Sequence, residues 1–142
     1  MSTPIPADII GASGYVGGEL LRLIAGHPHV DLASAISDSA AGKTIGDLFG
    51  HLAVACEGQQ FVAHADWLDH VARDSQLALF SAAPHGDSAA VIAGAIDACE
   101  NKGIEVHVVD SSADFRFARQ EDWESVYGAT HGAPQLLDKF VC

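Results

Sequence analysis

Three glycines near the start of the chain have the spacing of a phosphate-binding loop. Gly11, Gly14 and Gly17 lie between the apolar run 7–10 and an amphipathic segment. In such a loop the first glycine permits a tight turn, the second lets a pyrophosphate approach the backbone, and the third lets helix and strand pack closely. This context favours dinucleotide binding over a purely structural turn. We expect the cofactor contacts to come from Gly11, Ser13, Gly14, Tyr15, Val16 and Gly17.

Polar residues after the second apolar run could contact the adenosine ribose of the dinucleotide. Asp38 lies 21 residues beyond Gly17, where a carboxylate would hold the 2′- and 3′-hydroxyl groups of NAD. Ser37, Ser39 and Lys43 surround it and could instead accept the 2′-phosphate of NADP. The alternative is a solvated polar loop without a ligand. The sequence therefore leaves the choice between NAD and NADP open.

Strand-like and helix-like segments alternate along the chain. The pattern predicts strands at 7–10, 30–36, 61–63, 77–81 and 105–110. It predicts helices at 14–26, 66–73, 87–102 and 120–126, with Asp66 capping the second helix and 37–50 mainly loop. The first helix should bury an apolar face made of Val16, Leu20, Leu21, Leu23 and Ile24. We expect one domain, 1–142, with a Rossmann-type, doubly wound α/β fold: a mainly parallel sheet with helices on both faces.

The composition excludes several other classes of function. Hydrophobic residues make up 49% of the chain and charged residues 18%, as in a globular protein. The net charge of -12 repels the phosphates of nucleic acids and anionic membranes. Because a dinucleotide is also an anion, its binding must depend on local backbone N–H groups. No apolar run approaches the roughly 20 residues of a membrane span, and no secretory signal is evident, so we expect a cytoplasmic protein.

Cysteine and histidine patterns indicate no metal site. Cys56, Cys99 and Cys142 are far apart and form no C-x-x-C pair, so they predict neither a zinc site nor a disulfide framework. His27 and His29 flank a proline and cannot share one face of a regular helix as a metal pair. We expect both histidines to be exposed to solvent.

Several segments of the chain occur in the same order in one enzyme family. They are 11–23, 27–28, 41–43, 51–52, 84–88 and 110–116, followed by Trp123, Tyr127, Gly128 and His131. Together they cover nearly the whole chain and resemble N-acetyl-gamma-glutamyl-phosphate reductase, a relative of aspartate-semialdehyde dehydrogenase. The resemblance implies NADP-dependent reduction of N-acetyl-glutamyl 5-phosphate to the semialdehyde, with release of phosphate, in arginine biosynthesis. It also implies a small-molecule acyl-phosphate substrate and a full-length protein that forms a homo-oligomer.

The resemblance assigns a cofactor role to the loop after the fourth predicted strand. Pro84, His85 and Gly86 would lie against the cofactor near its ribose and nicotinamide. This loop follows the carboxyl end of a strand, where ligands bind in open parallel sheets. The alternative for His85 is an exposed loop histidine without a ligand.

A substrate role falls by resemblance on the loop after the fifth predicted strand. Arg116, with Ser112, would hold the substrate phosphate, because a guanidinium can donate two parallel hydrogen bonds to phosphate oxygens. The alternative is that Arg116 pairs with Asp114 or Asp110 to fix the loop, and the two roles can coexist.

Two catalytic groups of the family have no counterpart in this sequence. The nucleophilic cysteine of the family lies in a Pro-Gly-Cys motif, which is absent, and Lys-Phe-Val before Cys142 does not match it. The acid-base histidine belongs to a substrate and dimerisation domain that is also absent, and His131 matches a different family position. We therefore expect a cofactor domain that binds a dinucleotide without turning over substrate.

Four alternatives to this interpretation stay open. The chain could belong to an aspartate-semialdehyde dehydrogenase or to an aminoadipyl-phosphate analogue of the reductase. It could also be a dinucleotide-sensing module without chemistry. Finally, family members often have an arginine just after the second strand, where this chain has Asp38 and Ser39, so NAD is not excluded as the cofactor.

Overall fold

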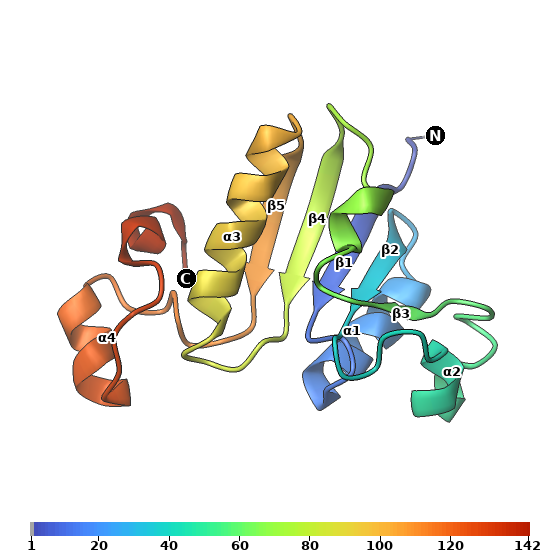
Figure 1. Ribbon diagram of the computed structural model, residues 1–142, viewed down its shortest axis with the longest axis horizontal. Helices are drawn as coiled ribbons and strands as arrows, with labels where there is room; N and C mark the ends of the chain where they lie inside the picture. Colours follow the sequence, from blue (N-terminus) through green and yellow to red (C-terminus); the bar gives the residue numbers. More distant parts are fainter. Residues whose placement is uncertain (1) are drawn as a thin grey trace.

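The computed structural model describes residues 2–142, which form a five-stranded parallel sheet with helices (Figure 1). The strands are β1 (Ile5–Ile10), β2 (Val30–Ile36), β3 (Phe61–Val62), β4 (Gln76–Ser81) and β5 (Glu105–Asp110). The helices are α1 (Tyr15–Ala25), α2 (Ile45–Leu48), α3 (Ser88–Asn101) and α4 (Gln120–Tyr127). Short 3-10 turns occupy Gly50–Leu52, Trp67–His70 and Pro134–Lys139.

The strand order is β3-β2-β1-β4-β5, so the chain first builds outward from β1 and then crosses back to its other side. Ala7 and Ile9 of β1 pack in one core with Leu21 of α1, whereas Ile10 packs in a second core with Ala95 of α3. Because consecutive strand residues point to opposite faces, α1 and α3 cover opposite faces of the sheet. The predicted doubly wound, Rossmann-type fold is confirmed.

The last part of the chain forms a third core against the start of α3. Phe115 and Leu136 pack there with Ala89 and Ile92 of α3. Figure 1 shows α4 and the C-terminal turn beyond α3, on the β5 side, whereas α2 lies on the β3 side. Packing of this segment brings the loop after β5 close to the first turn of α3.

The buried face of α1 is narrower than the sequence predicts. Leu21 and Ile24 are buried, but Val16 is 50% exposed and Leu23 is 54% exposed. Gly17 and Gly18 are buried on the same face as Leu21, so α1 approaches the sheet closely, and Leu20 packs against this core while only partly buried. Val16 and Leu23 lie one step around the helix and remain in solvent.

Two local features differ from the expected pattern, although 37–50 is mainly loop, as predicted. The segment 37–50 contains α2, which begins with a capping box: Thr44 Oγ1 accepts from Asp47 N–H, and the Asp47 carboxylate accepts from Thr44 N–H. Asp66 makes no capping hydrogen bond, and the helix expected at 66–73 is only the turn Trp67–His70. Buried Trp67 anchors this turn, and Val71 returns to an extended backbone.

None of the helices within residues 2–142 combines the length and apolar character that crossing a membrane requires.

One carboxyl group lies inside the sheet without a hydrogen-bond partner. Asp8 of β1 is fully buried, and neither of its carboxylate oxygens is hydrogen-bonded within residues 2–142. Its register neighbour on β2 is Ser34, and its charge contributes to a raised pKa of the Cys99 thiol on α3. Burial raises the pKa of Asp8 from 3.8 to about 7. Ionised Asp8 therefore destabilises the folded state.

The first prediction concerns the pH dependence of stability. The folded pKa of Asp8 lies above its unfolded value, so the folded state binds the extra proton between the two values. The free energy of unfolding should therefore fall as pH rises from about 4 to about 7, by up to roughly 4 kcal/mol from this group. Asp8→Asn should remove that component, as measured by urea unfolding at a series of pH values.

A matched control is Asp31→Asn, which removes an exposed carboxylate from neighbouring β2. It should unfold with the pH dependence of the unmodified chain. If Asp8→Asn also keeps that dependence, the destabilising role of Asp8 is wrong.

Candidate dinucleotide-binding site

The turn between β1 and α1 is held by two glycines for steric reasons. Gly11 has a φ of +72°, and a Cβ there would lie 2.8 Å from the carbonyl oxygen of Ala82. A Cβ on Gly17 would collide with the backbone of Gly11 and Ala12. By contrast, a Cβ on Gly14 would meet only the Gly11 oxygen, at an ordinary 3.6 Å. The protein itself therefore does not require a glycine at position 14.

The N-terminus of α1 is open to an anion. Gly14 is its N-cap, with an extended backbone and no side-chain capping bond, and the first turn contains no acidic residue. Tyr15 is fully exposed at this end of the helix. Unpaired N–H groups and the positive end of the helix dipole together favour a bound phosphate.

A cavity of about 490 Å³ adjoins the phosphate loop at the end of β2. Three of its lining serines are joined by hydrogen bonds between their hydroxyl groups. Ser13 Oγ lies 2.7 Å from Ser37 Oγ, which lies 3.3 Å from Ser39 Oγ. The N–H of His64 donates to Asp38 Oδ1 at 2.7 Å and fixes that carboxylate at the cavity wall. The lining residues are Ile10, Gly11, Ser13, Ile36, Ser37, Asp38, Ser39, His64 and Val91.

The structure does not bring every predicted adenosine-side residue into this cavity. Lys43 is exposed and is not among the lining residues, so neither lysine nor arginine lines the cavity within the described part of the chain. His64 was not predicted as a site residue. Its contribution is a backbone N–H, which every residue except proline carries, so its side chain is no signal for this contact.

The loop after β4 runs beside the phosphate loop. Ala82 N–H donates to the Ile10 oxygen at 2.8 Å. Beyond it Pro84, His85 and Gly86 are exposed, and the His85 ring lies 5.2 Å from that of Tyr127 on α4. The first and fourth strands thus bring the predicted phosphate and nicotinamide segments to one edge of the sheet.

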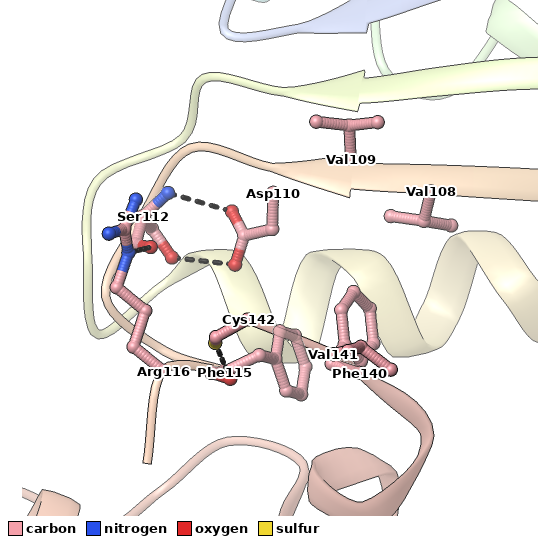
Figure 2. Close-up of a pocket in the computed structure, with 9 residues that line it drawn as sticks. All are labelled: Val108, Val109, Asp110, Ser112, Phe115, Arg116, Phe140, Val141 and Cys142. Atoms are coloured by element: carbon pink, nitrogen blue, oxygen red, sulfur yellow. Dashed lines mark hydrogen bonds between the residues drawn. The ribbon is translucent and has the colours of Figure 1, made fainter.

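A second cavity, of about 340 Å³, lies at the carboxyl end of β5 (Figure 2). The Asp110 carboxylate accepts from Ser112 N–H at 3.0 Å and from Ser112 Oγ at 2.7 Å. Arg116 is exposed, and its Nε donates to the Ser112 oxygen at 3.1 Å. The lining residues are Val108, Val109, Asp110, Ser112, Phe115, Arg116, Phe140, Val141 and Cys142.

The alternative in which Arg116 pairs with Asp110 or Asp114 is wrong. Within residues 2–142 Arg116 makes no ion pair with either carboxylate. Both acids already accept hydrogen bonds, Asp110 from serines and Asp114 from the backbone. The guanidinium instead holds its own loop by donating to the carbonyl oxygen of Ser112.

Two of the three cysteines lie outside both cavities. Cys56 and Cys99 are buried, and burial raises the pKa of both thiols, that of Cys99 to about 11. Cys142 lines the second cavity, where its thiol lies 3.4 Å from the Phe115 oxygen. His27 and His29 are exposed, as predicted.

His131 is a structural residue in this chain. It is buried, and its Nδ1 accepts from Ala133 N–H at 3.1 Å. The proton therefore resides on Nε2, which donates to the Asp114 oxygen at 2.6 Å. Both ring nitrogens are thus used to hold the C-terminal segment.

The second prediction tests the phosphate loop. Gly14→Val should leave the fold intact, because position 14 has room for a side chain. It should weaken dinucleotide binding by about a hundredfold or more, because the branched side chain stands where the pyrophosphate approaches backbone N–H groups. Calorimetric titration with NADPH and NADH measures the loss.

The matched control is Gly26→Ala at the other end of α1, where an added Cβ meets nothing within 4 Å. It should bind as the unmodified chain does. Undiminished binding by folded Gly14→Val would show that the phosphates lie elsewhere.

Comparison with known proteins identifies relatives of this chain. At 39% identity, 96% of the chain aligns with 37% of N-acetyl-gamma-glutamyl-phosphate reductase from Azotobacter vinelandii. At 36% identity, 99% of it aligns with 37% of a putative [LysW]-L-2-aminoadipate/[LysW]-L-glutamate phosphate reductase from Aeropyrum pernix. The chain thus spans little more than a third of the length of these curated relatives.

A crystal structure of aspartate semialdehyde dehydrogenase with NADP from Candida albicans aligns with 92% of this chain and 41% of its own, at a TM-score of 0.49 and 18% identity. Residues 7–139 match the family described as semialdehyde dehydrogenase, NAD binding domain. This match includes every residue that lines the first cavity and most of those that line the second. The chain therefore belongs to the semialdehyde dehydrogenase NAD-binding domain family.

Proposed function

We propose that this chain is the cofactor-binding part of an NADP-dependent reductase. The reaction is reduction of N-acetyl-glutamyl 5-phosphate to its semialdehyde with release of phosphate, in arginine biosynthesis. The observation that carries the proposal is the open N-terminus of α1 beside the phosphate loop, in a chain 39% identical to such a reductase. The whole enzyme would be a cytoplasmic homo-oligomer that acts on a small molecule and binds neither nucleic acid nor membrane.

The residues present suit a dinucleotide laid across the carboxyl edge of the sheet. Its phosphates would contact the backbone from Gly11 to Gly17, whose helix end is uncapped. Its adenosine ribose would face Ser37 and Asp38 in the first cavity, and exposed Lys43 would approach a 2′-phosphate from outside that cavity. The bound cofactor would supply the hydride for reduction. The loop that carries Pro84, His85 and Gly86 would support its ribose and nicotinamide, since this loop follows the strand next to β1.

The second cavity suits the phosphate of the substrate. Ser112 and Arg116 line it, and the guanidinium is a good partner for phosphate oxygens because its donors are fixed in a plane. Arg116 would orient the acyl phosphate and stabilise the phosphate as it leaves. The thioester-forming cysteine and the acid-base histidine would come from residues outside this chain, which lacks the family's Pro-Gly-Cys motif.

A different substrate and a different cofactor each have specific support. The Aeropyrum pernix relative supports an aminoadipyl-phosphate analogue as the substrate, because it is almost as similar as the glutamyl-phosphate reductases. NAD instead of NADP is supported by Asp38, because its carboxylate would accept hydrogen bonds from ribose hydroxyls and repel a 2′-phosphate. The cavity it lines contains no lysine or arginine among residues 2–142 to offset that repulsion.

The third prediction concerns cofactor choice. Asp38→Ser should raise the affinity for NADPH relative to that for NADH by about tenfold, because it removes a negative charge from the 2′-phosphate position. Both dissociation constants are measured by quenching of protein fluorescence. Asp31→Ser, at the opposite end of β2 from the Asp38 loop, removes an equal charge and should leave the ratio unchanged. An unchanged ratio in Asp38→Ser would place the ribose elsewhere.

The fourth prediction concerns catalysis. The 142-residue chain should bind the dinucleotide but not reduce NADP with N-acetyl-glutamate semialdehyde and phosphate, the reverse of the proposed reaction. Absorbance of the reduced nicotinamide follows this reaction, and the Azotobacter vinelandii relative is the positive control. Turnover by the chain alone would show that the chemistry does not need residues from outside it.

A further inference from the structure

Asp114 is fully buried although it lies in the loop after β5. Its Oδ1 accepts from Gly86 N–H at 2.7 Å, and its Oδ2 accepts from Ala89 N–H at 2.9 Å. Its own N–H donates to Ser112 Oγ at 3.1 Å, and its carbonyl oxygen accepts from His131 Nε2 at 2.6 Å. The residue is therefore held through its backbone on the β5 side while its carboxylate reaches across to the β4 side.

The Asp114 carboxylate occupies the N-terminus of α3. Asp87 stands at the N-cap position of this helix but makes no side-chain capping bond. Asp114, distant in sequence, satisfies the N–H of Ala89 in the first turn instead. Its negative charge also offsets the positive end of the α3 dipole. Of the two long helices that begin at this edge of the sheet, α1 is open to a phosphate and α3 is closed by Asp114.

The loop from Pro84 to Gly86 is held at its start, where the Pro84 oxygen accepts from Asp87 N–H at 3.2 Å and from Ser88 N–H at 3.0 Å, but few contacts hold the rest of it. All three residues are exposed, and a Cβ on Gly86 would meet nothing within 4 Å. Gly86 also has a φ of +94°, a backbone conformation that glycine adopts readily. Its hydrogen bond to the Asp114 carboxylate is thus a strong constraint on the loop, in addition to the His85–Tyr127 ring contact.

The sheet order would bring the loop after β4 next to the nicotinamide half of a dinucleotide bound at α1. β2 and β4 flank β1 on opposite sides. With phosphates at α1 and adenosine near Asp38 after β2, the other half of the molecule extends over the loops after β4 and β5. Those are the loops that Asp114 joins. The turn that holds Asp114 also holds Arg116, whose N–H donates to Ala113 O at 3.2 Å and whose Nε donates to Ser112 O.

We propose that Asp114 is a positioning residue that joins the loop after β4 to the loop after β5. Through its two carboxylate hydrogen bonds it fixes the surface beneath the nicotinamide half of the cofactor, and through its backbone it holds the turn that carries Arg116. The hydride donor and the substrate phosphate thereby share one rigid support. This proposal rests on the proposed function, because it requires a dinucleotide bound at α1.

The test compares Asp114→Asn with Asp87→Asn. The amide that replaces the Asp114 carboxylate would keep one acceptor and turn an NH₂ group toward one of the two N–H donors, so one hydrogen bond becomes a repulsion. Asp87→Asn removes an equal charge at the start of α3, in the loop after β4, but from an exposed side chain that makes no capping bond. Each variant is titrated with NADPH and with 2′,5′-ADP, which carries only the adenosine half, and in parallel with NADH and AMP.

Asp114→Asn should bind the whole dinucleotide about tenfold more weakly, because its nicotinamide support is loosened. It should bind the adenosine fragment within about twofold of the unmodified chain, because that fragment touches neither loop. Asp87→Asn should bind both ligands normally. An equal loss for dinucleotide and fragment would overturn the positioning role, since a general loss of structure affects both. Failure of the unmodified chain to bind any dinucleotide would overturn the proposed function as well.

A measurement on the unmodified chain covers the case in which Asp114→Asn does not fold. Hydrogen exchange by NMR should show the Gly86 amide exchanging at least about tenfold more slowly than the neighbouring His85 amide. Gly86 N–H has the Asp114 acceptor, whereas His85 lies in the same exposed loop. Equally fast exchange at both amides would mean that Asp114 does not hold the loop, and it would overturn the proposal.

Discussion

The candidate site depends on how the N–H groups at the starts of two helices are satisfied. The first turn of any α-helix has backbone donors without intrahelical partners. In α3 the Asp114 carboxylate accepts one of them, so that helix end is closed. In α1 the N-cap is Gly14, and no side chain of residues 2–142 caps it. The chain is strongly acidic, with a net charge of -12, and this uncapped end gives a dinucleotide phosphate a local partner that the overall charge does not.

Close approach between the backbones of the phosphate loop, α1 and the chain after β4 places that uncapped helix end at the edge of the sheet. Gly11 and Gly17 let the turn, the strand and α1 come together with no room for side chains, and the chain leaving β4 lies directly against Gly11. The same compactness narrows the buried face of α1 and leaves Val16 and Leu23 in solvent. Loss of apolar contact along α1 is thus a consequence of the geometry that brings the phosphate loop to the edge of the sheet.

Two buried acids have opposite effects on the stability of the fold. Asp114 is satisfied by two backbone N–H groups, and through them it joins separate loops. Asp8 lies between strands and α3 with no hydrogen-bond partner among the described residues, and burial raises its pKa to about 7. A buried carboxylate stabilises a structure only where donors meet it, so these two residues of the same type have different energetic effects.

Much of the fold was predictable because its signals are local. The alternation of apolar strands with helices predicts the parallel sheet, and the glycine spacing after β1 predicts the tight turn, since each depends on residues close in sequence. The resemblance of ordered motifs likewise predicted the family. The helix at α2 was missed because its cap and first turn lie in a segment rich in serine, alanine and glycine.

The sequence by itself determined which segments reach the carboxyl edge of the sheet and which glycines turn there. Only the tertiary structure decided which polar groups meet. Asp114 caps α3 in place of adjacent Asp87 through contacts 25 and 28 residues apart in sequence. Asp38 is fixed by a backbone N–H 26 residues away. Such partners depend on strand order and on the packing of the C-terminal segment, and no local pattern of residues encodes them.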